Sequence, residues 1–190
     1  MPKTIVDMSM SLDGFTAGPS IGPEFPMGQG GERLHDWLFS GKTDIDKKIV
    51  DEVVSESGAV ILGRHTYDVG IGDPWGGVSP FRVPAFVVST SRPKKMVDGF
   101  SFINDGIESA LNEAKLIAGN KNVWIMGGAN LASQYIKAKL IDELHIHLVP
   151  LLLGAGSRLF ENTGPSIIET EKIKSIESAG VTHFIFRIVR

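Results

Sequence analysis

The segment VILGRHTYDVG, residues 60–70, decides the fold of this chain. An apolar run enters Gly63, and a cation, an imidazole and a hydroxyl follow at once in Arg64, His65 and Thr66. The apolar run is typical of a buried strand, and the polar residues are typical of the first turn of a helix. A strand that passes through glycine directly into a helix indicates an α/β fold, in which ligands bind beyond the carboxyl ends of the strands.

The same arrangement recurs further along the chain. The segment NVWIMGG, residues 122–128, is apolar and ends in a glycine pair, and the helical pattern of residues 129–140 follows it. A third predicted strand, AFVVSTSRP at residues 85–93, ends in hydroxyls and a guanidinium. Because a helix N-terminus offers free N–H groups and a partial positive charge, the two strand-to-helix junctions suit phosphate.

Together, the three strand ends predict a cradle for a pyrophosphate and one further phosphate. This is the outline of a dinucleotide that carries a 2′-phosphate. Glycine allows the backbone to approach a phosphate, and the planar arginine fork matches phosphate oxygens. The glycine pattern differs from the usual G-x-G-x-x-G motif. Besides the glycines, the predicted contributors are Arg64, Ser89, Thr90, Ser91 and Arg92.

The remaining patterns complete one domain over residues 1–190. Strands and helices alternate in the middle of the chain, and strands cluster at its end. This order favours an α/β domain with a mostly parallel sheet that carries antiparallel strands at one edge. The predicted strands are 4–11, 59–63, 85–93, 122–128, 143–154 and two within 172–190, and the predicted helices are 32–41, 43–58, 107–120 and 129–140.

The bulk properties exclude several classes of protein. The formal charge of −3 gives no electrostatic case for nucleic acid binding. The absence of cysteine excludes disulfides and thiolate chemistry. No apolar run reaches the roughly 18 residues that span a bilayer, and no secretion signal is present. We therefore expect a cytoplasmic protein that acts on a small molecule, without membrane contact.

One further pattern suggests a different chemistry. Glu143, His145 and His147 alternate along a predicted strand and therefore share one face. A carboxylate and two imidazoles on one face would suit zinc or non-haem iron. The alternative, which we favour, is a half-exposed strand with no metal, such as one at a subunit contact.

Taken together, these segments resemble the dihydrofolate reductase fold. VILGRHTYD, VVSTSRP and VWIMGGANLASQYI carry the resemblance in that order. SMSLDGF and DELHIHLVPLLLGAGSRLF are similar to the reductase domain of the bifunctional riboflavin-biosynthesis deaminase-reductase. The resemblance covers residues 4–190. It implies a three-layer α/β/α domain that binds NADPH and reduces a pterin-like or pyrimidine-like compound.

The resemblance also places the cofactor. The glycine pair would carry a cis peptide against it, and the glycine- and proline-rich segment 17–31 would form a flap that excludes water from hydride transfer. The residues implied to contact NADPH are Gly63, Arg64, His65, Thr66, Ser89, Thr90, Arg92, Gly127, Gly128, Ala129, Asn130 and Leu131.

Substrate and catalytic residues follow from the same comparison. Ser11, Leu12 and Asp13 would lie near the nicotinamide, with Asp13 as proton donor or substrate anchor. The alternative for Asp13 is an ordinary turn residue before glycine. By the same comparison, Glu143 would approach the substrate or fix the active-site end of its strand. Trp37, from its position beside the 17–31 segment, could stack on a flat ring, and ordinary packing is the alternative that we favour.

Two features depart from these families. Dihydrofolate reductase has a carboxylate in the helix before this strand, whereas ungapped counting reaches Lys47, with Asp46 one position away. Asp36 is another acid, but it precedes that helix. Dihydrofolate is therefore disfavoured as substrate. The chain also has neither the length nor the cysteines for an added zinc deaminase domain.

We therefore predict a stand-alone NADPH-dependent reductase that delivers hydride to a C=N or C=O carbon. The activity of the related riboflavin-pathway branch is that of a 5-amino-6-(5-phosphoribosylamino)uracil reductase. The competing hypotheses are a non-catalytic NADP-binding sensor and a metal-dependent enzyme that uses Glu143, His145 and His147. The family and the apolar segment LVPLLLG lead us to expect a homodimer.

Overall fold

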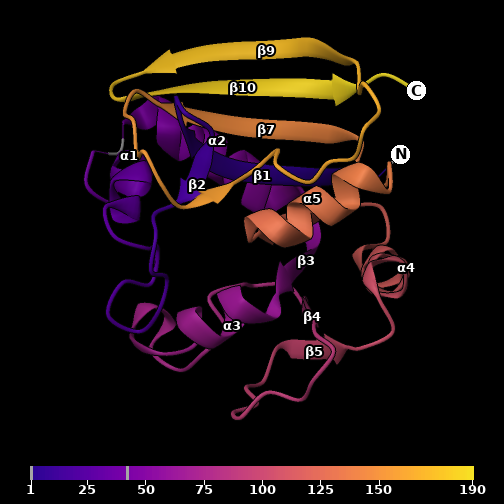
Figure 1. Ribbon diagram of the computed structural model, residues 1–190. Helices are drawn as coiled ribbons and strands as arrows, with labels where there is room; N and C mark the ends of the chain where they lie inside the picture. Colours follow the sequence, from indigo (N-terminus) through magenta and orange to yellow (C-terminus); the bar gives the residue numbers. More distant parts are fainter. Residues whose placement is uncertain (1, 42) are drawn as a thin grey trace.

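A computed structural model describes residues 2–41 and 43–190, and a twisted eight-stranded sheet runs through it (Figure 1). The spatial order is β5-β4-β3-β6-β1-β7-β10-β9, and only the β7-β10 and β10-β9 pairs are antiparallel. This arrangement confirms the predicted fold class. The strands are β1 Thr4–Ser11, β3 Ser57–Gly63, β4 Ala85–Val88, β5 Phe100–Ile103, β6 Asn122–Gly127, β7 Glu143–Val149, β9 Thr170–Ser178 and β10 Val181–Ile188.

Helices cover both faces of the sheet. On one face, α4 (Ile107–Ala118) and α5 (Ala129–Lys137) pack small and branched side chains onto alternate residues of the central strands. On the other face, α3 (Arg64–Gly70) packs on β3 and β4, while α1 (Asp36–Phe39) and α2 (Asp44–Glu56) pack near β7 and β10. Among the described residues, none of the helices is long and apolar enough to cross a membrane.

Helix α2 begins as the sequence predicts. The Thr43 side chain accepts a hydrogen bond from the Asp46 amide, and the Asp46 carboxylate accepts one from the Thr43 amide at 2.8 Å. The helix predicted at residues 43–58 ends at Glu56, and Gly58, which follows its last turn, already lies in β3. A β-carbon at Gly58 would lie 2.8 Å from the Ala118 Cα, so the close approach of α4 explains this glycine.

Some short elements differ from the prediction. The predicted helix 32–41 divides into a 3-10 turn, η1 (Gly31–His35), and the single turn of α1. In the strand-like segment 143–154, β7 ends at Val149, directly before the Pro150 that is expected to break it. The sequence did not predict the four-residue strand β5 or the small pair β2 (Phe15–Ala17) and β8 (Ser157–Arg158). Strands this short carry little periodicity.

The glycine- and proline-rich segment 17–31 folds back on itself. The Gly18 amide donates to the Met27 carbonyl at 2.9 Å, and the Gln29 amide donates to the Pro19 carbonyl at 2.8 Å. Gly28 has φ +75°, and a β-carbon there would meet the Gly18 carbonyl. Only glycine permits this close crossing of two backbone segments. The segment therefore forms a compact loop between β2 and η1.

Candidate active site

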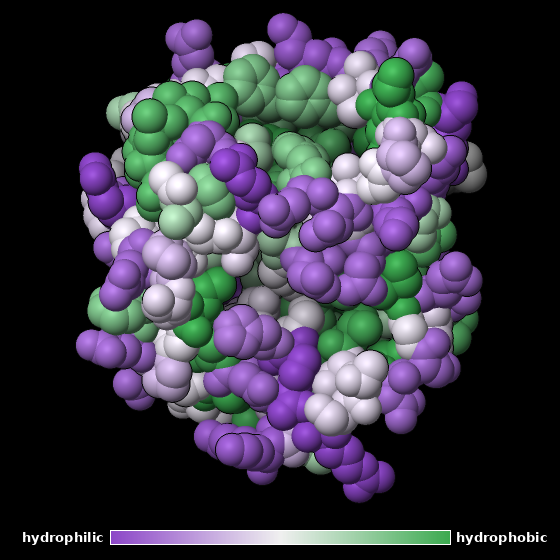
Figure 2. Space-filling model, viewed as in Figure 1, coloured by the Kyte–Doolittle hydropathy of each residue, from purple (hydrophilic) through white to green (hydrophobic). Residues whose placement is uncertain are grey.

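A cleft of about 1380 Å³ opens at the carboxyl ends of the central strands. In the space-filling view it lies near the middle of the face, between α5 above and α3 below (Figure 2). Side chains of the 17–31 loop, including Ile21 and Met27, also line it. The predicted residues that line it are Gly63, Arg64, His65, Thr66, Ser89, Thr90, Gly127, Gly128, Ala129, Asn130, Leu131 and Trp37.

Two helix N-termini form one end of this cleft. Strands β3 and β6 are neighbours, with Leu62 beside Gly127, so α3 and α5 begin side by side. Neither helix has a side-chain cap, which leaves the amides of its first turn for a ligand. The Gly127-Gly128 peptide is cis, as the resemblance implies. A β-carbon at Gly128 would lie 3.3 Å from the Thr66 hydroxyl, so glycine keeps this approach open.

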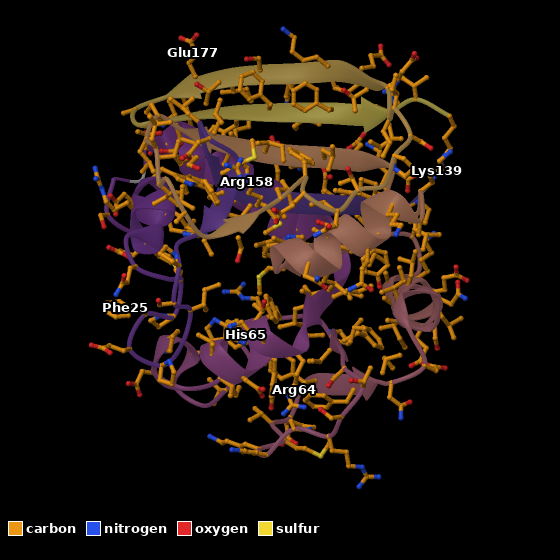
Figure 3. All side chains as sticks on the ribbon, in the orientation of Figure 1. Phe25, Arg64, His65, Lys139, Arg158 and Glu177 are labelled. Carbon is orange, nitrogen blue, oxygen red and sulfur yellow. The ribbon has the colours of Figure 1, made fainter. Side chains whose placement is uncertain are left out.

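Arg64 links α3 to the end of β4. Its Nε donates to both carboxylate oxygens of Asp68 at 2.8 Å, and one terminal nitrogen donates to Ser89 Oγ at 3.3 Å and to the Ser91 carbonyl at 2.9 Å. Figure 3 shows Arg64 and His65 on α3, across the cleft from α5. Arg92 is exposed and does not line the cleft, although its neighbour Ser91 does.

These groups fit a phosphate-bearing nucleotide. Uncapped amides, a glycine pair without β-carbons and a guanidinium beside hydroxyls are the donors that phosphate oxygens accept. The same donor set has no carboxylate except Asp68, which Arg64 already neutralises. Except for Arg92, the residues predicted to contact phosphate therefore lie together at this end of the cleft.

A buried polar chamber forms the other end of the cleft. In β1, Asp7 lies beside His145 of β7, and Ser9 lies beside His147. His147 in turn lies beside His183 of β10. Because neighbours in register share a face, all five side chains project under α1 and α2. Asp7, Ser9 and His147 line the cleft.

Trp37 closes this chamber. Its indole N–H donates to Ser9 Oγ at 3.0 Å, and its ring centroid lies 4.7 Å from that of His147 and 5.0 Å from that of His183. The residue is 5% exposed and lines the cleft.

The ionisable side chains of the chamber shift one another's pKa values. Burial alone would raise the pKa of Asp7, but hydrogen bonds and charges from His147 and His145 outweigh it and lower that pKa. Burial alone would lower the pKa of His145, but Asp7 and Glu143 raise it to about 9. Burial lowers the pKa of His35, which also lines the cleft. At neutral pH the chamber therefore holds an ionised Asp7 beside a cationic His145.

Two buried atoms of the chamber wall lack a close hydrogen bond among the described residues: His35 Nδ1, and Asp7 Oδ2, which makes only a longer ion pair with His145 Nδ1 at 3.5 Å. Buried polar atoms without partners are rare in proteins, and each costs free energy. Because both residues line the cleft, a polar group of a bound molecule would satisfy them.

The metal hypothesis loses its geometric basis. Glu143 forms an ion pair with Lys3 at 2.8 Å, and hydrogen bonds from His145 and Lys3 lower its pKa to about 2. His147 instead contacts Asp7 and His183. Across residues 2–41 and 43–190, no three acidic or histidine side chains are placed to hold one metal ion. Glu143 also does not line the cleft, so the structure does not bring it to a substrate.

Asp13 and its neighbours lie outside the cleft wall. The Asp13 carboxylate accepts hydrogen bonds from Ser11 Oγ at 2.5 Å and from the Leu153 and Gly154 amides at 3.1 and 2.7 Å. The Ser11 hydrogen bond and those two amides lower the pKa of Asp13 to about 2. Ser11 is buried in this turn, and Leu12 is 57% exposed. This geometry favours the turn role for Asp13 over proton donation.

Sequence reasoning missed the polar face of the sheet. Asp7, His35, His183 and Asp46 were not predicted as site residues, and His147 was considered only for a metal. A signal was present, because Asp7 and Ser9 interrupt an apolar strand at the same spacing as His145 and His147. Without the register, nothing connected the two strands.

Comparisons with known proteins agree with this geometry. The RibD C-terminal domain family matches residues 2–182. The uncharacterized protein YwjB of Bacillus subtilis is 31% identical over 188 residues, which covers 96% of this chain and 97% of YwjB. A putative riboflavin biosynthesis protein from Shewanella sp. PV-4 has a similar structure, with a TM-score of 0.76, 24% identity and 99% coverage of both chains.

A second similar structure is more distant in sequence. Dihydrofolate reductase from Enterococcus faecalis, complexed with NADP(H), has a TM-score of 0.64 and 14% identity, with coverage of 99% of this chain and 97% of that chain. At this identity the likeness shows the shared fold. From the family match over nearly its whole length, the chain belongs to the RibD C-terminal domain family.

Proposed function

We propose that the protein is a reductase that uses NADPH to deliver hydride to a C=N or C=O carbon of a small flat heterocycle. One observation supports this proposal above the others: a single cleft joins the uncapped N-termini of α3 and α5 to the polar chamber beneath Trp37. Family membership supports a reductase, and the complex of the similarly folded Enterococcus faecalis enzyme is with the same cofactor.

The residues of the chain would bind and orient the cofactor. When bound, NADPH supplies the hydride. The first-turn amides of α5, at Ala129 and Asn130, would hold the pyrophosphate. Arg64 and Ser89 would hold the 2′-phosphate, because guanidinium and hydroxyl already converge there. The 17–31 loop and Trp37 would exclude water from the reacting atoms.

We propose a pterin-like or pyrimidine-like ring without a phosphate as the substrate. Trp37 offers a flat surface, and Leu38 and Val50 add apolar wall. Among the described residues, the arginines of the wall are Arg64 and Arg82, and no lysine lines it. A phosphoribosyl group would need an arginine or lysine at the chamber end, because the histidines there already pair with carboxylates, so an unphosphorylated ring fits better.

A cofactor-binding comparison tests the proposal. Arg64→Ala should weaken NADPH binding about 10- to 100-fold, as expected for lost charged hydrogen bonds, and change NADH binding much less. Arg187→Ala is the matched control, because Arg187 pairs with Glu171 on the β9-β10 edge. Equal losses for both cofactors would contradict the 2′-phosphate assignment. Arg92→Ala, measured alongside, decides whether that predicted contact exists.

A turnover screen tests the reaction itself. Loss of NADPH absorbance is followed with pterins, diaminopyrimidines and quinonoid compounds, with and without phosphoribosyl groups. Oxidation with an unphosphorylated ring is the expected result. Tight NADPH binding without oxidation on any compound would favour the non-catalytic sensor instead.

The homodimer expected from the resemblance stays a prediction. In the LVPLLLG segment, Leu152 is 72% exposed, while Leu151 and Leu153 pack against the apolar cluster that contains Leu34 and Trp37. Sedimentation of the purified chain tests the oligomeric state.

A further inference from the structure

A line of hydrogen bonds leads from the cleft wall into the interior of the protein. His147 Nε2 lies 3.1 Å from Asp7 Oδ1, and His147 Nδ1 lies 2.8 Å from His183 Nδ1. His183 Nε2 lies 2.9 Å from Asp46 Oδ1. His147 is 4% exposed, His183 2% and Asp46 0%, so water does not compete for these contacts.

The two ends of this line are the carboxylates of Asp7 and Asp46, and both accept hydrogen bonds. The pKa of Asp7 is lowered by its histidine neighbours, as described above. Burial would raise the pKa of Asp46, but the Thr43 amide and side-chain partners including His183 outweigh it and lower that pKa. An ionised carboxylate only accepts hydrogen bonds. The Nε2 atoms of His147 and His183 must therefore both carry a hydrogen.

The contact between the two imidazoles then requires one more proton. A neutral imidazole carries a single N–H, and in each ring that N–H already donates to a carboxylate. Two bare Nδ1 lone pairs facing each other at 2.8 Å would repel, whereas one hydrogen between them makes a strong charged hydrogen bond. The His147-His183 pair thus holds three hydrogens on four nitrogens and carries one positive charge.

The surroundings favour that charge. From β1 the pair faces Asp7, from α2 it faces Asp46, from α1 it faces the neutral ring of Trp37, and His35 of η1 lies nearby with a lowered pKa. His145, on the far side of Asp7, is cationic and is itself neutralised by Glu143. Burial lowers the pKa of His183, although the hydrogen bond to Asp46 opposes this effect. Of the two rings only His147 lines the cleft, so a proton can leave the pair toward a substrate only from the His147 side.

We propose that the His147-His183 pair stores the proton that the reduction consumes. This inference rests on the proposed reductase function. As hydride reaches the substrate carbon, the N–H bond at His147 Nε2 breaks and the proton passes by way of Asp7 to the substrate nitrogen or oxygen, where a new N–H or O–H bond forms. The pair is left neutral and regains one proton from water after the product leaves. In sum, NADPH, one proton and the substrate give NADP⁺ and the reduced product.

His183 and Asp46 are positioning residues in this scheme. Asp46 fixes the hydrogen of His183 at Nε2, so that Nδ1 is left as an acceptor toward His147. Asp46 is itself fixed by the capping box at the start of α2. The helix that covers the chamber therefore also orients its proton store.

Nuclear magnetic resonance of the protein without cofactor tests the stored proton directly. With ¹⁵N-labelled histidine at neutral pH, the wild type should show a far-downfield proton resonance coupled to Nδ1 of His147. His183→Gln should abolish it, because the glutamine amide can donate to Nδ1 without an extra proton. His65→Gln is the control, since it removes an exposed histidine outside the pair, and the resonance should persist. If the wild-type spectra show that neither Nδ1 of the pair carries a hydrogen, the proposal is overturned. This result needs only the wild-type protein, so it holds even if His183→Gln does not fold.

Kinetics provide the second readout. In His183→Gln, kcat at pH 7 should fall about 10- to 100-fold, which is less than the roughly 10²- to 10⁴-fold loss of an acid catalyst because His147 itself remains, and NADPH affinity should be unchanged. The basic limb of the kcat–pH profile should also shift to lower pH. An unaltered profile would overturn the proposal. If NADPH is not oxidised at all, the reductase assignment fails while the resonance can still be present, so the two failures are distinguishable.

Discussion

The two faces of strands β1, β7 and β10 carry buried side chains of opposite polarity. On the α5 side, Val6, Leu144 and Ile146 belong to the main apolar core. On the α2 side, one residue along, Asp7, His145 and His147 form a buried polar network. Successive residues of a strand point to opposite faces, so each strand contributes to both environments. One face supplies stability, and the other concentrates ionisable groups at a cleft.

The largest expected effect comes from the apolar face. Ile146→Ala should lower the free energy of unfolding by about 2–5 kcal/mol, because it leaves a cavity among buried neighbours. Urea denaturation measures the change. Turnover per folded molecule should stay near the wild-type value. A loss of turnover without a loss of stability would mean that the two faces are not separate in function.

The next effect concerns His145 on the polar face. Its pKa is raised from 6.5 to about 9, so its stabilising contribution is complete below about pH 6.5 and disappears as pH rises to about 9. The loss is on the order of 3 kcal/mol. Urea denaturation at pH 6, 7.5 and 9.5 measures it. His145→Gln should show a much flatter dependence in this window, and parallel curves would show that His145 is not the titrating group.

A smaller effect tests the aromatic cover of the polar face. Trp37→Phe keeps a ring near His147 but removes the indole N–H that binds Ser9. The free energy of unfolding should fall by about 1 kcal/mol, the usual net value of one hydrogen bond. Trp37→Leu also removes the ring, and it should further weaken binding of a flat substrate. Equal substrate affinity in both variants would show that the ring at position 37 does not stack on the substrate.

The smallest effect separates the polar face from the turn that follows β1. Asp13→Asn should change turnover less than twofold, because the carboxylate binds the Leu153 and Gly154 amides outside the cleft wall. Thermal unfolding should show a modest decrease in Tm. A hundredfold loss of turnover with the fold intact would restore Asp13 as the proton donor.

Local sequence signals predicted most of the fold. The capping box of Thr43 and Asp46, the strand-to-helix junctions at Gly63 and Gly128, and the hairpin around Gly180 all depend on residues close together in the chain. The cofactor end of the cleft could be predicted for the same reason. Each of its parts is a single junction between one strand and the next helix.

The substrate end could not be predicted in this way. Asp7 and His147 lie 140 residues apart, and His183 and Asp46 lie 137 apart. The family comparison directed attention to Asp13 and Glu143 instead, and neither lines the cleft. Only the position of Trp37 was anticipated, from its place beside the 17–31 loop.

By itself, the amino-acid sequence determined which segments become strands and helices, and that phosphate-binding groups follow three of the strands. Periodicity, capping and glycine are local properties that do not require a partner segment. Only the tertiary structure decided that Asp7, His147, His183 and Asp46 meet. Their meeting depends on the register of β1, β7 and β10, since a slip of one residue would turn every one of these side chains to the opposite face.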